Sequence, residues 1–292
     1  MVQDLRQVSV VGLGLLGGSI ALSVLRSFAR VKVVGYSHRG VTRRKARELG
    51  VAMEVAEDLG QSVSEADLVV LATPISTFEA VFGEIAGALR DGCIVTDVGS
   101  TKVVPHRWAA AKLPKSVRYV GSHPIAGSEQ RGIEFARDDL FERAMCILTA
   151  TKRTDAGAAR RLGEFWSQLG CFVKSMTPRE HDRVFANVSH LAHIAAAALI
   201  NANDGEDLKF AGKGFIDTSR VASGPANIWA DVLMTNAENA VRGIDRIISE
   251  LSKIRKAINS ENGRQIEGLL EKARDKRRRL IDYKIEKREL IQ

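Results

Sequence analysis

Glycines at positions 12, 14 and 17 constrain this chain more than any other feature, because they separate a predicted strand from a predicted helix. Residues 8–11 form a short apolar run of strand type, and a helical pattern starts directly after the glycines. In that position Gly12 permits a tight turn, Gly14 lets the backbone approach a pyrophosphate, and Gly17 lets helix and strand pack closely. The free N–H groups at the helix start then face the phosphates. The motif therefore predicts a dinucleotide-binding βαβ unit, with a purely structural turn as the alternative.

Short β-branched runs alternate with helical stretches as far as about residue 175. We expect strands at residues 8–11, 31–36, 68–72, 94–97, 118–120, 146–149 and 172–174. A continuous apolar run such as residues 68–72 is typical of a strand buried on both faces, as in parallel sheets covered by helices. The sequence therefore predicts an α/β fold whose residues 1–175 form a Rossmann-type, doubly wound domain.

The chain changes character near Thr177. Residues 177–180 form a capping box with proline at the first helical position, so we expect a helix to begin there. No convincing strand follows, and residues 176–292 are predicted to form an all-helical domain. The last long pattern has one buried apolar face, formed by Ile247, Leu251, Ile254 and Ile258. The apolar surface of this domain exceeds what it can cover by itself, which predicts a homodimer through the C-terminal helices.

Composition narrows the class of protein. With 292 residues, 45% of them apolar and 27% charged, the chain suits two globular domains. We expect no signal peptide, and we expect charged residues to interrupt every apolar window of about 20 residues, which predicts a cytoplasmic protein with no membrane partner. The widely spaced Cys93, Cys146 and Cys171 fit buried thiols better than disulfides or a metal site.

The excess of basic residues has a local origin. The net charge is +8, and residues 271–292 hold nine basic and five acidic side chains, which is half of the excess. Mixed signs at helical spacing favour a solvated helix. Because aromatic residues do not alternate with the basic ones in this stretch and no groove-reading motif occurs, no nucleic-acid partner is expected.

The second predicted strand bears on the choice of dinucleotide. Ser37 stands where an NAD site usually has an acidic residue for the ribose hydroxyls, and Arg39 and Arg43 follow it. Arginines in this place can pair with a 2′-phosphate, which favours NADP over NAD, although an exposed helix face explains them equally. The residues expected to line the cofactor site are Gly12, Gly14, Leu15, Leu16, Gly17, Ser37, His38, Arg39, Arg43, Thr73 and Pro74.

Two polar residues follow neighbouring strands at the edge where ligands bind. Ser100 comes after the strand at 94–97, and His123 lies in the loop expected after the strand at 118–120. Both side chains should then face the nicotinamide. A histidine in that place can accept the proton of an alcohol as hydride leaves, and Ser100 can orient it. The alternative is a structural histidine.

Three motifs together resemble one enzyme family. G-L-G-L-L-G-G-S at residue 12, D-V-G-S-T-K at residue 97 and H-P-I-A-G-S-E at residue 123 occur in this order and with these gaps. They are similar to those of the prephenate/arogenate dehydrogenase family of tyrosine biosynthesis, and the similarity covers almost the whole chain. The resemblance implies oxidative decarboxylation of a cyclohexadienol: hydride moves from the ring carbinol to NAD(P)⁺, carbon dioxide leaves and the ring becomes aromatic. It also implies a helical dimerisation domain and no metal.

The resemblance implies roles for residues in the first domain. His123 matches the catalytic histidine that hydrogen-bonds the ring hydroxyl, and Ser100 matches the serine that assists it against the nicotinamide. Glu129 matches an acidic residue near the substrate pocket. Whether the small-molecule substrate is prephenate or arogenate stays open.

The helical half supplies further matches. His190 and His193 lie in an S-H-L-A-H segment like that of the family, where the second histidine is expected near the substrate's side chain. Arg220 matches an arginine that holds a substrate carboxylate, and Asp217 is expected to brace it. From the residues alone, the histidines share a helical stripe with small neighbours; a wet helix face is the alternative. For Arg220 the alternative is an ordinary ion pair with Asp217 or Asp231.

Two other classes of function fit the same architecture. One is another NAD(P)-dependent reductase of the β-hydroxyacid dehydrogenase type, which typically uses a lysine on the helix between the domains, where this chain has histidines. The other is a non-catalytic dinucleotide-sensing regulator, which fold alone does not exclude. A regulator has no need of Ser100 and His123 beside the nicotinamide, so the dehydrogenase is the favoured hypothesis.

Overall fold

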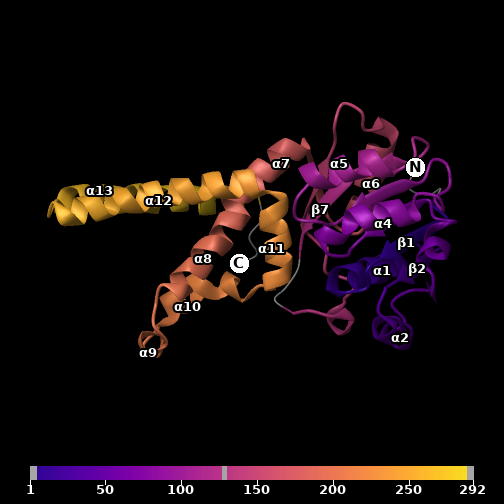
Figure 1. Cartoon of the computed structure of the whole chain (residues 1–292), viewed down its shortest axis with the longest axis horizontal. Helices are drawn as coiled ribbons and strands as arrows, with labels where there is room; N and C mark the ends of the chain where they lie inside the picture. Colours follow the sequence, from indigo (N-terminus) through magenta and orange to yellow (C-terminus); the bar gives the residue numbers. More distant parts are fainter. Residues whose placement is uncertain (1–4, 127–129, 288–292) are drawn as a thin grey trace. The chain divides into compact units, whose positions relative to one another are not determined.

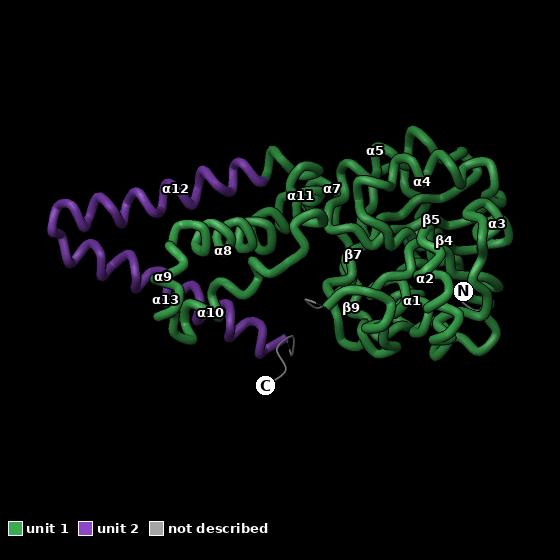
Figure 2. The backbone as a smooth tube through the Cα atoms, turned by 60° about the horizontal axis from the view of Figure 1, so that its bottom comes forward, with its two compact units in different colours: residues 1–239 green, residues 240–292 purple. Residues whose placement is uncertain are grey.

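A computed structural model describes residues 5–126 and 130–287. By compactness the chain divides into two units, residues 1–239 and 240–292, which Figure 2 colours green and purple. Each unit is described by itself.

A parallel sheet of six strands forms the centre of the first unit (Figure 1). Its strands are β1 (Gln7–Val11), β2 (Lys32–Tyr36), β3 (Glu54–Val55), β4 (Leu68–Leu71), β5 (Ile94–Asp97) and β6 (Arg118–Tyr119). They lie in the order β3-β2-β1-β4-β5-β6, so the direction of the winding reverses between β1 and β4. Ligands of such sheets bind at that reversal, outside the carboxyl ends of the strands. The Rossmann-type prediction is confirmed; β3 was not predicted, because two residues carry no periodic pattern.

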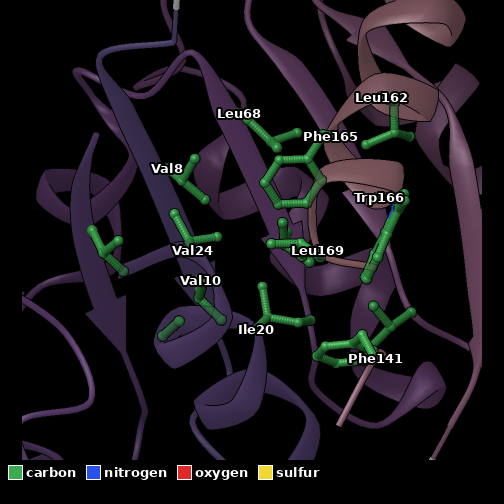
Figure 3. Close-up of a cluster of buried hydrophobic side chains, with 14 of the residues drawn as sticks. Val8, Val10, Ile20, Val24, Leu68, Phe141, Leu162, Phe165, Trp166 and Leu169 are labelled. Carbon is green, nitrogen blue, oxygen red and sulfur yellow. The ribbon is translucent and has the colours of Figure 1, made fainter. Parts of the chain in front are cut away.

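Helices cover both faces of this sheet. They are α1 (Leu15–Ser27), α2 (Gly40–Glu48), α3 (Leu59–Val63), the short η2 (Ile75–Thr77), α4 (Phe78–Ile85), α5 (Val103–Lys112), the short η3 (Ile133–Phe135) and α6 (Ala156–Gln168). Alternate residues of one strand enter different cores: Leu68 packs with the cluster around Trp166 (Figure 3), and Val69 packs with the cluster around Phe78. Burial on both faces explains why β4 reads as a continuous apolar run.

A second sheet carries the predicted catalytic histidine. It contains β7 (Gly121–Ile125), β8 (Met145–Thr149) and β9 (Phe172–Met176), with β7 antiparallel and β9 parallel to β8. The expectation that His123 lies in a loop is therefore wrong, since it pairs with Ile147 inside β7. Glycine and proline hide this strand in the sequence, and Pro124 is tolerated because β7 is an edge strand.

Helices follow β9, and no further strand occurs between Thr177 and Lys287. In the first unit they are α7 (Pro178–Phe185), the π-helical η4 (Ala186–His190), α8 (Leu191–Asn201), α9 (Gly205–Leu208), α10 (Lys213–Ser219), the short η5 (Arg220–Ser223) and α11 (Ala226–Thr235). The capping box predicted at residue 177 is present, with the Glu180 N–H donating to the Thr177 hydroxyl at 3.2 Å. The helical prediction for this region is confirmed.

One helical stretch contradicts the expectation that charged residues interrupt every apolar window long enough to cross a membrane. Residues Pro178–Asn201 are long and apolar enough to cross a membrane, with 28% of the apolar window buried, so charged residues do not interrupt every such window. A core helix of a soluble protein passes the same test. Here His181 and Asp182 of this stretch are buried, with His181 against strand β7 of the second sheet and Asp182 at the start of α5.

The second unit is a pair of long helices. These are α12 (Ala237–Asn259), whose first turn belongs to the first unit, and α13 (Gly263–Glu286), which begins with the Asn262 side chain accepting from the Gln265 N–H at 3.0 Å. The single buried face predicted for α12 is only half right. Ile247 and Ile254 are half-buried, whereas Leu251 and Ile258 are exposed.

Candidate active site

The glycine loop between β1 and α1 has the shape that a pyrophosphate requires. Gly12 has φ +101°, and a Cβ there would meet the backbone of Ala72 at 2.7 Å and the Thr73 side chain at 2.8 Å. A Cβ on Gly17 would overlap the Gly12 carbonyl oxygen, whereas a Cβ on Gly14 would meet no atom within 4 Å. Gly12 and Gly17 are therefore needed by the fold, and Gly14 leaves its open face at the start of α1, where free N–H groups attract phosphate. These residues fit a dinucleotide.

The loop after β2 is held by an arginine. Arg43 donates from Nη1 to the Ser37 carbonyl at 2.7 Å and from Nε to Glu57 at 2.8 Å, and Arg47 donates to the same carboxylate at 2.5 Å. These bonds lower the pKa of Glu57, with the Arg47 hydrogen bond as the largest cause. The Arg43 guanidinium is thus engaged within the protein. Arg39 and His38 are exposed, and among the described residues Arg39 has no ion-pair partner.

A cavity of about 250 Å³ lies between the start of α1 and the end of β7. Its lining residues are Leu15, Ile125, Ala126, Gln130, Phe135, Arg137, Leu140 and Ala144. Side chains two residues apart in a strand point to the same face, so His123 lies on the side of β7 that Ile125 presents to this cavity. Leu16, the next residue of α1, is half-buried and packs against the core. Thr73 and Pro74 follow β4, with Thr73 beside Gly12.

His123 belongs to a hydrogen-bonded triad that the sequence analysis did not identify. Its Nδ1 lies 2.9 Å from Nε2 of His181, and Nδ1 of His181 lies 2.8 Å from Oδ1 of Asp182. Asp182 also accepts the backbone N–H groups of Lys102 at 2.7 Å and Val103 at 2.8 Å, at the positive start of α5. These partners make the carboxylate the acceptor from His181. His181 Nε2 then accepts from His123 Nδ1, and Nε2 of His123 keeps its lone pair.

Burial keeps the histidines of this triad neutral. Burial, together with the charges of His181, Lys102 and His190, holds the pKa of His123 well below its usual 6.5. Burial and the same kind of repulsion lower the pKa of His181 to about 2. Burial raises the pKa of Asp182, and the two backbone N–H groups oppose that rise. Near neutral pH His123 is therefore uncharged, and its Nε2 lone pair is available to accept a hydrogen bond.

Ser100 follows β5, and His190 approaches it from the helical side. Ser100 is half-buried, and the neighbouring Thr101 hydroxyl lies 2.9 Å from that of Thr235 in α11. Burial lowers the pKa of His190 to about 4, against opposing effects of Asp182 and the Ser100 backbone. Asn236 lies 3.3 Å from His190 Nδ1 and donates to the Asp182 carbonyl at 2.8 Å. Elements far apart in sequence thus meet around Ser100.

Two buried histidines face Trp229, and each has one ring nitrogen without a hydrogen-bond partner in the described structure. His193 stacks on Trp229 with ring centroids 3.7 Å apart and an angle of 9°, and His190 meets the same ring edge-on at 6.2 Å. His190 is 1% exposed and His193 is 8% exposed, which excludes the wet helix face. His190 Nε2 and His193 Nδ1 have no hydrogen-bond partner in the described structure. Because unmet buried polar atoms cost about 1–3 kcal/mol each, they point to a polar ligand.

The other described residues predicted to bind substrate are not buried as the two histidines are. Arg220 is exposed on η5, beside Val221, whose backbone interacts with His193. Asp217 is exposed on α10. Asp231, considered as an alternative partner for Arg220, accepts from the Ser76 hydroxyl at 2.5 Å instead. Glu129 lies outside the described residues, so its predicted position stays untested.

Sequence reasoning missed His181, Asp182, Trp229 and Asn236. His181 and Asp182 follow the capping box in a charged helical turn, and their contacts lie on strands and helices some 60 to 80 positions earlier. No periodic pattern or recognised motif marks such residues. A buried-looking histidine directly followed by an acid was the available signal.

Comparisons with known proteins agree with this geometry. Residues 20–175 match the model of the nucleotide-binding domain of prephenate dehydrogenase, and residues 177–272 match that of its dimerization domain. Prephenate dehydrogenase of Bacillus subtilis (strain 168) is 33% identical over 92% of this chain and 75% of that protein.

Two solved structures extend the comparison. Prephenate dehydrogenase from A. aeolicus, in complex with hydroxyphenyl propionate and NAD⁺, superposes with a TM-score of 0.87 and 32% identity, covering 94% of this chain and 98% of that one. Synechocystis arogenate dehydrogenase superposes with a TM-score of 0.81 and 30% identity, covering 94% of this chain and 99% of that one. Because two consecutive domain models and full-length relatives agree, this chain belongs to the prephenate dehydrogenase family.

Proposed function

We propose that the protein oxidises and decarboxylates prephenate, arogenate or both with a nicotinamide dinucleotide. The observation that carries this proposal is the triad of His123, His181 and Asp182, which leaves one imidazole lone pair at His123 Nε2, on the strand whose end borders the cavity at the start of α1. Relatives named as prephenate and arogenate dehydrogenases support it. They favour this enzyme over another reductase or a non-catalytic regulator.

The residues divide the chemistry among them. A dinucleotide held at the loop of Gly12, Gly14 and Gly17 would supply the acceptor for the hydride of the ring carbinol carbon. His123 Nε2 accepts the hydrogen bond of the carbinol hydroxyl and takes its proton as the carbon–oxygen bond gains carbonyl character. The proton returns to that oxygen when carbon dioxide leaves and the ring becomes a phenol. Asp182 and His181 keep the proton of His123 on Nδ1, and Ser100 orients the reacting groups.

The helical half binds the substrate in this proposal. Arg220 is assigned to a substrate carboxylate, for which its planar guanidinium is suited. His190 and His193 are assigned to polar groups of the substrate, because each has an unmet buried nitrogen. Asp217 is assigned to bracing Arg220, and Glu129, which lies outside the described residues, keeps the role near the substrate that the family resemblance implies. Division of the chain into a nucleotide-binding domain at 1–175 and a substrate domain at 176–292 belongs to the same proposal.

Turnover assays test the function. Purified protein is mixed with NAD⁺ or NADP⁺ and with prephenate or arogenate, and the absorbance of the reduced cofactor is followed. We expect turnover with at least one pair of substrates. If neither cyclohexadienol is oxidised with either cofactor, the proposed function is wrong.

NADP is the proposed cofactor. Ser37 is buried at the end of β2 and carries no charge to repel a 2′-phosphate, and Arg39 is exposed beside it. Arg43, whose donors are engaged by Ser37, His38 and Glu57, is assigned to holding the loop rather than to direct pairing with phosphate.

A homodimer in the cytoplasm is the proposed assembly. Helix α12 exposes four apolar side chains: Val241, Ile248, Leu251 and Ile258. Their spacing of seven, three and seven residues is that of a helix packing against another helix. The match to a dimerization domain supports association, and the three free, buried cysteines fit a reducing compartment. Light scattering should give a dimer, and Leu251→Asp should dissociate it; a monomeric wild type contradicts the proposal.

A further inference from the structure

A fully buried ion pair lies directly behind Ser100. Lys102 Nζ lies 2.5 Å from Asp97 Oδ1, and both side chains are 0% exposed. Lysine is almost never fully buried unless it is paired, and removing two charges from water costs several kcal/mol for each ion. A pair of leucine-sized apolar residues would fill this space at lower cost. The pair therefore calls for an explanation other than stability.

Both members of the pair bond the backbone of Gly99, the residue that precedes Ser100. The Gly99 N–H donates to Asp97 Oδ1 at 2.7 Å, and Lys102 Nζ donates to the Gly99 carbonyl at 2.7 Å. Gly99 is also confined sterically, because a Cβ there would meet Asp97 Oδ1 at 2.9 Å and the Phe78 ring at 3.1 Å. The backbone that carries Ser100 is thus fixed on both its donor and its acceptor side.

The same aspartate bonds the strand that carries His123. The Ser122 hydroxyl donates to the Asp97 carbonyl at 2.7 Å and lies 2.9 Å from the Thr96 hydroxyl. Tyr119 donates to Asp97 Oδ2 at 2.6 Å, which leaves neither carboxylate oxygen without a partner. Asp97 is therefore in contact with the residue before Ser100 and with the residue before His123.

Lys102 is connected to the triad as well. Its backbone N–H donates to Asp182 at 2.7 Å, and Asp182 orients His181, which bonds His123. One residue thus fixes the Ser100 loop through its side chain and the triad through its backbone.

We propose that Asp97 and Lys102 are positioning residues, which set the place of Ser100 relative to His123 and so act on the chemical step rather than on binding. This inference rests on the roles proposed for Ser100 and His123. A misplacement of about 1 Å in such a pair can cost about 10²-fold in rate. The effect should therefore appear in kcat and not in KM.

The test combines Lys102→Met with Ser100→Ala in a double-mutant cycle. Lys102→Met should lower kcat about 10²-fold, with KM for cofactor and substrate changed less than about threefold. In the Ser100→Ala background the same change should have little further effect on kcat, because the group it positions is gone. Lys112→Met is the matched control: this lysine lies on α5, is 42% exposed and pairs with Glu79, and its loss should leave kcat unchanged.

Further measurements distinguish a positioning role from misfolding of the variant and from a failure of the proposed function. Circular dichroism and thermal unfolding verify that Lys102→Met folds. If it does not, Ser122→Ala carries the test, since it removes the hydroxyl that bonds the Asp97 carbonyl and the Thr96 hydroxyl, and kcat should fall about tenfold. The inference is overturned if the folded variant keeps wild-type kcat, or if Lys102→Met costs the same factor with and without Ser100. If the wild type oxidises neither substrate, the proposed function has failed instead.

Discussion

The glycine loop and the histidine-bearing helices α7, η4 and α8 offer their proposed ligands different kinds of contact. At the glycine loop the ligand meets backbone N–H groups and space left by missing side chains, and the conformation depends on Gly12 and Gly17. On the helices the ligand meets side chains, such as His190 and His193, whose nitrogens lack partners in the described structure. The first arrangement needs only local sequence; the second depends on contacts made across the fold.

Because the two regions offer different contacts, substitutions in each are expected to change different kinetic or binding constants. Changes on the helices should alter rate or substrate affinity and leave dinucleotide affinity intact. Changes near the glycine loop and β2 should alter cofactor use alone. The expected effects range from the loss of the proton acceptor to a modest change in cofactor preference.

The largest effect is expected at the histidine that joins the two regions. His123→Asn should lower kcat about 10²- to 10⁴-fold, because asparagine has no lone pair able to take the proton. Dinucleotide affinity, measured by calorimetry, should stay within about twofold of the wild type. A variant that keeps full turnover would assign the proton to another group, and one that loses dinucleotide binding would deny the separation of the two regions.

The neutral histidines of the helices predict a loss of stability in acid. The pKa of His181 falls to about 2 and that of His190 to about 4 on folding, both from 6.5, with burial as the main cause in each. Below pH 6.5 the unfolded chain therefore binds more protons than the folded protein. As the pH is lowered, the free energy of unfolding decreases until the pKa of the folded state is reached. Between these two pKa values, each histidine lowers the free energy of unfolding by about 1.4 kcal/mol for each unit by which the pH falls.

Urea unfolding at pH 7.5, 6 and 5 measures this loss. His190→Asn should reduce the slope by about the share of one histidine. An unfolding free energy that stays constant over this range would show that these imidazoles are not buried in the neutral form.

A smaller effect is expected at the rim of the substrate region. Arg220→Gln should raise the KM for substrate about tenfold to a hundredfold, since a charge-assisted hydrogen bond contributes about 1.5–3 kcal/mol. kcat should change less, because the carboxylate is held equally before and during the reaction. Lys213→Gln, an exposed change on α10, serves as the control. Equal KM values for both variants and the wild type would remove Arg220 from the site.

The same contrast explains how much the sequence could predict. The glycine motif, the buried strand β4 and the Thr177 cap are set by neighbouring residues, and each prediction is confirmed. His123 was correctly expected beyond β6 but wrongly in a loop, because its strand exists only through pairing with β8. The link from Asp182 to Lys102 spans 80 positions and leaves no periodic pattern. Long-range hydrogen bonds of this kind become visible only in the folded structure.

The smallest effect is expected at Ser37, the residue that we propose favours NADP over NAD. Ser37→Asp places a carboxylate beside the position of a 2′-phosphate, and repulsion near a surface amounts to about 1–4 kcal/mol before screening by salt. kcat/KM with NADP⁺ should therefore fall about tenfold, while kcat/KM with NAD⁺ stays the same or rises as aspartate accepts the ribose hydroxyls. Ser167→Asp adds the same charge to an exposed position of α6 and should change neither value. The penalty should shrink at high ionic strength, because salt screens the exposed Arg39 and the charge of the 2′-phosphate. If Ser37→Asp lowers activity with both cofactors equally, the substitution has disturbed the loop that Arg43 holds, and Ser37 does not discriminate between them.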